Sequence, residues 1–265
     1  MNKNMFPPSI TNLLLSEGQR FEVDGDFKIA LGTGIIPLCA TSRSGKTALA
    51  YVMLDYVIRF TNRPIILDNF PQKVIDEAIP ESWKGRVSNM PFSMIAEIDQ
   101  PAVWLVDDTG TGYNSRDWQS SGKLLSRTAG ILSHFGGGQT VIFTTQLMSG
   151  VDVSFFRYTN ISPIIRYVDP DVLKFERPEF IDMIREGQYQ LSRVSKGRYL
   201  DFFWSVKDSM LCPSYYPDWL KNEKNKTIRD MLSRPMRYHE LDDKKALIMG
   251  KGVNTWKDKD KENTT

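Results

Sequence analysis

The stretch from Ile35 to Ala50 constrains the fold more than any other part of the chain. It reads IIPLCATSRSGKTALA, an apolar run followed by a short polar segment and then by residues that favour a helix. This order predicts a buried strand, a tight loop and the start of a helix that runs to about Phe60. It is the pattern of a phosphate-binding loop, with Ala40 where the first glycine usually stands.

The backbone and three side chains explain what such a loop can bind. Its N–H groups would surround a phosphate at the positive end of the helix dipole. Gly45 permits a close approach, Lys46 reaches the β- and γ-phosphates, and the hydroxyl of Thr47 ligates Mg²⁺. We therefore predict an ATP and Mg²⁺ site whose nucleotide-binding residues are Thr41, Ser42, Arg43, Ser44, Gly45, Lys46 and Thr47.

Two further expectations concern this loop. Lys46 should lie on an exposed loop, where it supplies charge and not packing. Ala40 carries a Cβ that resists positive φ, so the chain should enter the turn differently from a loop that begins with glycine. The alternative for the whole stretch is a chance match in an ordinary strand–turn–helix, and the strand before it and the helix after it count against that alternative.

The rest of the chain predicts an α/β fold. Apolar runs alternate with helical patterns from Ile35 onward, which indicates a mainly parallel sheet with crossover helices on its faces. The strands are expected at residues 35–39, 64–67, 102–106, 140–143 and 161–168, and the helices after the first at 74–79 and 115–135. Residues 91–98 suit either a helix or a strand.

Shorter elements are expected at both ends of the chain. Strands 21–23 and 27–30 should form an antiparallel hairpin around Asp24-Gly25-Asp26, after a short helix or strand at 11–15. The later elements are a helix at 180–191, a strand at 199–205, a helix at 227–232 and a disordered tail from Lys251. We predict a lead-in over 1–18, a core over 19–220 and a C-terminal extension over 221–265.

Composition excludes several classes of protein. The chain has 265 residues with 34 basic and 32 acidic side chains, so any nucleic-acid contact must come from a local patch. Two cysteines, Cys39 and Cys212, make neither a disulfide framework nor a zinc cluster. No stretch approaches the ~20 apolar residues that span a bilayer. We expect a cytoplasmic protein without a transmembrane segment.

Carboxylates and an amide follow two of the predicted strands. Asp107 and Asp108 end the run AVWLV, where Asp107 would hold Mg²⁺ through water and Asp108 would orient or deprotonate the attacking water. The alternative is that they form an acidic N-cap for the next helix. This alternative suits Asp108 alone better than it suits the two aspartates together. Gln146 follows strand 140–143 and Thr144-Thr145, at the ligand edge of such a sheet. It would contact the γ-phosphate or the lytic water there, or else bond to its own loop.

These motifs, with Asp68 after the second strand, resemble those of the HerA/FtsK superfamily of P-loop ATPases. The group includes DNA translocases, conjugation coupling proteins, viral genome-packaging ATPases and Zot-like proteins. The resemblance covers roughly residues 27–220 and is sharp only at the motifs; the segment SYYPDWL is also similar to one found after the core of small archaeal members. It implies a RecA-like P-loop NTPase fold and Mg²⁺-dependent ATP hydrolysis, with Asp108 as the catalytic carboxylate and Gln146 as the sensor.

The resemblance also implies partners. Family members work as hexameric rings that pump double-stranded DNA, so we expect a homo-oligomeric motor of the viral packaging type, in the host cytoplasm if viral. A capsid or membrane-complex protein is a further candidate partner. Two departures stand out: Asp108 replaces the usual Glu, and His134-Phe135 occupies the place where many members carry an arginine. The candidates for an arginine finger acting in trans are Arg127, Arg157 and Arg166.

Two alternatives to DNA movement remain open. One is a motor of the same fold that drives protein or filament assembly or secretion, and the other is a nucleotide-dependent switch with weak hydrolysis. Candidate DNA contacts are the cation pairs Lys123 with Arg127 and Lys196 with Arg198, and the aromatic residues Trp204, Tyr215, Tyr216 and Trp219. Cations of this kind usually belong to a solvated face, and aromatics at this density are more often core or interface residues.

Overall fold

The computed structural model describes most of the core and part of each end of the chain. The described residues are 5–6, 8–16, 21–23, 26–28, 34–41, 44–68, 70, 76–77, 79–98, 100–107, 138–151, 164–165, 168, 170–192, 200–203, 210–213 and 217–221. The predicted helices at 115–135 and 227–232 and the tail from Lys251 fall outside these ranges, as do three of the six residues of the helix predicted at 74–79.

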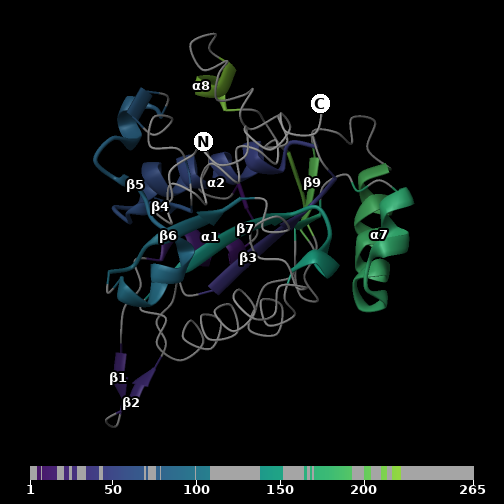
Figure 1. The fold of residues 1–265 in the computed structure, drawn as a ribbon, viewed down its shortest axis with the longest axis horizontal. Helices are drawn as coiled ribbons and strands as arrows, with labels where there is room; N and C mark the ends of the chain where they lie inside the picture. Colours follow the sequence, from purple (N-terminus) through teal and green to yellow (C-terminus); the bar gives the residue numbers. More distant parts are fainter. Residues whose placement is uncertain are drawn as a thin grey trace, which may run out of the picture.

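Within the described residues, eight strands form one sheet in the order β10-β9-β8-β3-β7-β6-β4-β5 (Figure 1). Their bounds are β3 Gly34–Cys39, β4 Ile65–Leu67, β5 Val87–Asn89, β6 Val103–Val106, β7 Thr140–Thr145, β8 Ile164–Ile165, β9 Leu200–Phe203 and β10 Met210–Pro213. The strands from β8 to β5 pair in parallel, whereas β9 and β10 pair antiparallel. The predicted mainly parallel sheet is therefore confirmed, and its central order is that of a RecA-like fold.

The N-terminal hairpin is also confirmed. Strands β1 (Phe21–Val23) and β2 (Asp26–Lys28) pair antiparallel, with Phe21 opposite Lys28. Asp26 belongs to the second strand and not to the turn. The hairpin projects away from the main sheet (Figure 1).

Two of the described α-helices, α2 and α7, lie close to the predicted ranges. The α-helices are α1 Pro8–Leu15, α2 Lys46–Phe60, α7 Pro178–Ser192 and α8 Asp218–Lys221. The 3₁₀ helices are η1 Glu81–Trp83, η2 Phe92–Glu97, η4 Met148–Gly150 and η5 Pro170–Phe175. Thus residues 11–15 are helical, and the ambiguous stretch 91–98 is a 3₁₀ helix. None of the helices among the described residues has the length and apolar character that crossing a bilayer requires.

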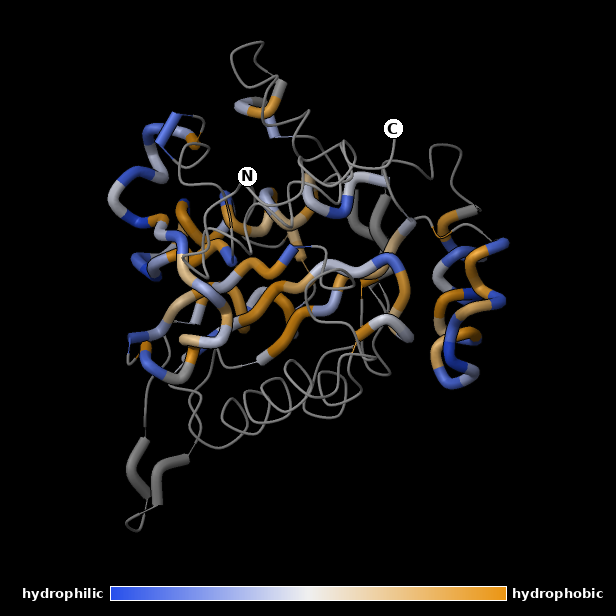
Figure 2. The backbone as a smooth tube through the Cα atoms, in the orientation of Figure 1, coloured by the Kyte–Doolittle hydropathy of each residue, from blue (hydrophilic) through white to orange (hydrophobic). Residues whose placement is uncertain are grey.

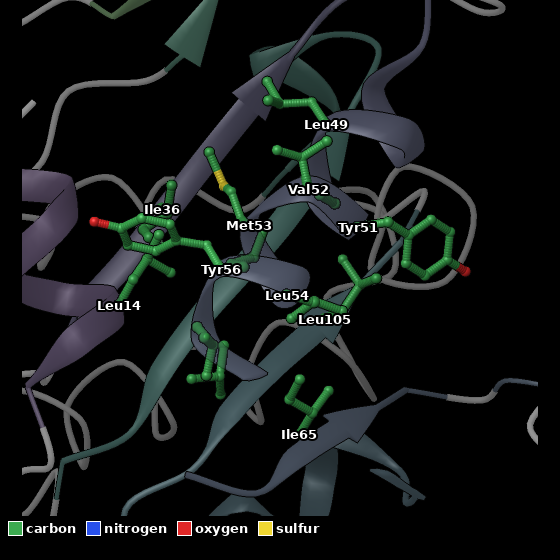
Figure 3. Packing of buried hydrophobic residues seen from close by; sticks show 14 of the residues in the cluster. Leu14, Ile36, Leu49, Tyr51, Val52, Met53, Leu54, Tyr56, Ile65 and Leu105 are labelled. Atoms are coloured by element: carbon green, nitrogen blue, oxygen red, sulfur yellow. The ribbon is translucent and has the colours of Figure 1, made fainter. Parts of the chain in front are cut away.

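The central strands are buried and largely apolar because both faces of the sheet are covered. Figure 2 shows the hydrophobic character of the central strands along the backbone. Ile36 and Leu38 belong to a cluster built with α1 and α2, and Figure 3 shows Ile36 beside Leu14 and Tyr56. The neighbouring Ile35 belongs to a second cluster with Trp104 and Phe143. Successive side chains on a strand point to opposite faces, so each strand contributes to both clusters. Since α1 contributes to the first cluster, residues 8–15 pack on the core; the domain limits at 18 and 220 stay predictions.

Buried Arg63 fixes the amino end of the sheet, opposite the phosphate-binding loop. Its side chain is 3% exposed and donates to the carbonyl oxygens of Leu13 (2.6 Å) and Ala102 (2.8 Å) and to Thr140 Oγ1 (2.9 Å). A buried charge needs such partners. Arg63 therefore ties α1 to the starts of β6 and β7.

Trp219 packs against the core in this structure. Its ring centroid lies 5.3 Å from those of Tyr51 and Trp83, and the indole N–H groups of Trp83 and Trp219 both donate to the carboxylate of Asp55. Burial raises the pKa of Asp55. The packing alternative therefore holds for Trp219, whereas Trp204, Tyr215 and Tyr216 lie outside the described residues.

Candidate nucleotide-binding site

The loop begins one residue later than the motif suggests. The Ala40 N–H donates to the carbonyl of Thr145 (3.2 Å), which extends the pairing of β3 with β7 beyond Cys39. Ala40 is fully buried. It acts as a continuation of the strand, which explains why alanine is accepted at this position.

Gly45 makes the turn into α2. Its φ of 87° and ψ of 25° lie in the left-handed region, which favours glycine. Ser44 closes the loop because its Oγ (2.7 Å) and its N–H (3.3 Å) both donate to the carbonyl of Thr41. Ser42 and Arg43, also predicted to bind nucleotide, lie outside the described residues.

The expectation that Lys46 lies on an exposed loop is wrong. Lys46 is the first residue of α2 and is only 8% exposed. Its stem can pack while the ammonium stays among polar groups, as long cationic side chains commonly do. Here Nζ donates to the carbonyl of Thr41 (3.2 Å), so the positive charge lies over the loop.

The metal-binding pair predicted from the motifs comes together. Thr47 Oγ1 lies 3.2 Å from Oδ1 and 3.1 Å from Oδ2 of Asp107, although the residues come from α2 and from the end of β6. Thr144 on β7 completes the group, because its hydroxyl donates to Asp107 Oδ1 over 2.6 Å. Sequence reasoning gave Thr144 no role. The signal was weak, because Thr144 is one of three buried threonines in β7, which reads TVIFTT.

These oxygen atoms fit Mg²⁺. Magnesium is usually held in nucleotide sites by one or two carboxylates together with substrate phosphates. Among the described residues, no group of three or more His, Cys, Asp or Glu side chains forms a metal cluster. Within the part of the chain that the structure describes, the hydroxyl of Thr47 and the carboxylate of Asp107 are oxygen groups that would suit Mg²⁺ at this edge of the sheet.

Gln146 follows β7 and its side chain is exposed. Its carbonyl accepts a 3.7 Å hydrogen bond from the Cys39 thiol, which places it beside the start of the loop. Burial, with a smaller contribution from the nearby Glu176 carboxylate, raises the pKa of Cys39 to about 12, so this thiol stays protonated at neutral pH. The thiol thus serves as a buried donor to the Gln146 backbone.

The other predicted site residues fall into two groups. Asp68 follows β4 as expected and its Oδ1 accepts from the Phe92 N–H (2.9 Å), so it anchors the start of η2. The remaining candidates lie outside the described residues: Asp108, Arg127, Arg157, Arg166, Lys123, Lys196 and Arg198.

Replacing Thr144 by valine should weaken the use of Mg²⁺. Valine has nearly the same shape, but it removes the 2.6 Å donor to Asp107, so this carboxylate is oriented less firmly. Partners that orient a metal ligand are worth roughly 10- to 100-fold in affinity or activity. We expect Thr144→Val to raise the Mg²⁺ concentration that gives half-maximal ATP turnover. The same change at Thr11, whose hydroxyl bonds the carbonyl of Phe6 on the far side of the core, is the control. Equal Mg²⁺ dependence in the two variants would contradict the role of Thr144.

Comparison with known proteins supports the fold. The sequence matches no family model and no curated protein. The structure is similar to B204, the DNA-packaging ATPase from Sulfolobus turreted icosahedral virus, with a TM-score of 0.50 and 13% identity over 69% of this chain and 98% of that one. It is also similar to EssC (ATPases 2 and 3) from Geobacillus thermodenitrificans, with a TM-score of 0.51 and 13% identity over 81% of this chain and 48% of that one. The chain therefore has the RecA-like P-loop ATPase fold of these proteins, as its resemblance to the HerA/FtsK group predicts.

Proposed function

We propose that this protein is a Mg²⁺-dependent ATPase that moves double-stranded DNA, of the kind that packages viral genomes. The ATPase activity is proposed from one observation. The side chains of Thr47, Asp107 and Thr144 are hydrogen-bonded to one another beside a loop that ends at Gly45, whose backbone is in the left-handed conformation. A structural turn between a strand and a helix has no need for a carboxylate held by two hydroxyls. In P-loop nucleotide sites, a loop hydroxyl and an aspartate placed in this way hold Mg²⁺.

Each residue has a distinct task in this proposal. The N–H groups of the loop bind phosphate oxygens, and the Lys46 ammonium exchanges the carbonyl of Thr41 for the β- and γ-phosphates. Asp107, oriented by Thr144, and Thr47 would hold Mg²⁺, which would offset the charge of the phosphates. Asp108 would accept the proton of the attacking water, and Gln146 would orient that water.

The proposal that DNA is the substrate is supported by the fold and by the position of the site. The fold is shared with B204, whose whole length this chain matches and which is a DNA-packaging ATPase. A nucleotide at the carboxyl edge of a parallel sheet also has one open side, which a neighbouring subunit can cover. We therefore propose a head-to-tail hexameric ring in the cytoplasm, in which Arg127, Arg157 or Arg166 completes the neighbour's site. A capsid or membrane-complex protein would dock the ring.

One experiment tests the motor. ATP turnover of the purified protein is measured with and without double-stranded DNA, beside a sizing measurement with and without ATP. We expect turnover that rises with DNA and a larger assembly with ATP. ATP turnover that is the same with and without DNA would favour a motor acting on protein. ATP binding without turnover would favour a switch. A protein that stays monomeric with ATP and DNA would end the ring proposal.

A further inference from the structure

The segment that follows Gln146 is held in place by hydrogen bonds. Residues 148–150 form η4, in which the N–H groups of Gly150 and Val151 donate to the carbonyls of Leu147 (3.2 Å) and Met148 (3.1 Å). The Thr145 hydroxyl also donates to the carbonyl of Leu147 (2.6 Å). We call residues 146–151 the Gln146 loop.

Glu176, which lies between η5 and α7, supplies the long-range contact to this loop. Its side chain is 7% exposed, yet its carboxylate accepts the N–H groups of Met148 (2.8 Å), Ser149 (2.7 Å) and Arg177 (2.9 Å). Hydrogen bonds to a carboxylate are stronger than those between neutral groups. Two of the three donors belong to the Gln146 loop, so the carboxylate fixes its backbone from the side of α7.

The residues next to Glu176 contact the same loop. Arg177 donates through Nη2 to the carbonyls of Val151 (3.2 Å) and Ser149 (3.5 Å), and Ser149 Oγ donates to the carbonyl of Phe175 (3.0 Å). Below these bonds, Met148 packs in one cluster with α7 residues and with Cys39 from the end of β3. The start of α7 and the edge of the nucleotide site therefore share one rigid junction.

The geometry points to Glu176 as a positioning residue for Gln146. The exposed Gln146 side chain has little packing to orient it, so its direction depends on the backbone that follows it. Functional side chains need such support to within about half an ångström. This inference rests on the proposed role of Gln146 at the γ-phosphate or the lytic water.

Glu176→Gln tests the inference with little change of volume. One carboxylate oxygen becomes an NH₂ group, which cannot accept the N–H of Met148 or of Ser149. We expect kcat to fall by roughly 10- to 100-fold, as for other groups that orient a functional residue, with the KM for ATP nearly unchanged. Glu179→Gln, the same substitution at an exposed position three residues further on, should leave kcat and KM as they are.

A double-mutant cycle separates positioning from general damage. If Glu176 acts through Gln146, Glu176→Gln should lower kcat no further in a Gln146→Ala background. Independent, multiplying losses would overturn the inference. Arg177→Met, which keeps the stem but removes the bonds to Val151 and Ser149, provides a second variant that should lower kcat in the same direction if Glu176→Gln fails to fold.

The two proposals fail differently. A wild-type protein that hydrolyses ATP, together with a folded Glu176→Gln variant of normal kcat, would overturn the positioning role and leave the ATPase proposal standing. A wild-type protein that binds ATP without turnover would overturn both. A parallel loss of ATP affinity in Glu176→Gln would also contradict the inference, because it would show that the change reaches the loop at residues 41–47.

Discussion

ATP turnover is expected to disappear in Lys46→Met while the protein stays folded. The structure makes methionine the better replacement because the Lys46 stem is buried and only 8% of the residue is exposed. Methionine fills the same space without the ammonium. Removing one group that stabilises developing charge costs about 100- to 1,000-fold in rate, and here the same charge also serves ATP binding. The loss should therefore appear in both kcat and ATP affinity.

Two matched variants make this test specific. Lys84→Met removes a cation that pairs with Glu81 on the surface, and it should leave turnover unchanged. Lys46→Ala should abolish turnover equally but also lower the melting temperature, because it empties space beside the buried start of α2. Measured ATP binding and turnover close to wild-type in a folded Lys46→Met protein would refute the phosphate-binding loop.

The sequence predicted those strands of the sheet whose own residues form a continuous apolar run. β3, β6 and the VIF centre of β7 form apolar runs because both faces of the sheet are covered, and these runs are visible in the sequence without any partner strand. The two strands that were missed lie at the sheet edges. β5 reads VSN and is mostly exposed, and β10 reads MLCP and ends in a proline, which edge strands tolerate. These two strands are defined by their hydrogen bonds to β4 and β9. Their sequences have no hydrophobic periodicity that would predict a strand.

The same distinction applies to the site. Thr47 and Asp107 were predicted because their motifs fix where each lies on its strand or helix, and parallel strands end at one edge. Thr144 was missed because threonine suits a strand for ordinary reasons. Glu176 was missed because it lies far from Met148 in the chain, and only the packing of α7 brings them together. Lys46 was misplaced because a binding motif carries no information about packing.

Asp107→Asn is the second change with a large expected effect. The asparagine oxygen can still accept the Thr144 hydroxyl at 2.6 Å, so the end of β6 should keep its place. The amide, however, removes the negative charge that Mg²⁺ requires from a carboxylate. We expect turnover to fall by about 100-fold or more at low Mg²⁺, since even groups that only orient a metal ligand are worth 10- to 100-fold. Asp182→Asn on the exposed side of α7 is the control of equal charge.

Asp108→Asn tells the two carboxylates apart. If Asp108 acts on the attacking water, this variant should bind ATP with Mg²⁺ as wild-type does and hydrolyse it slowly at every Mg²⁺ concentration. Asp107→Asn should instead recover part of its activity as Mg²⁺ is raised, because a lost metal ligand weakens binding and not the proton transfer. The informative measurement is therefore turnover against Mg²⁺ for each variant. Normal turnover in both would leave the pair as a cap for the chain that follows β6, and identical Mg²⁺ dependence would remove the division of roles between them.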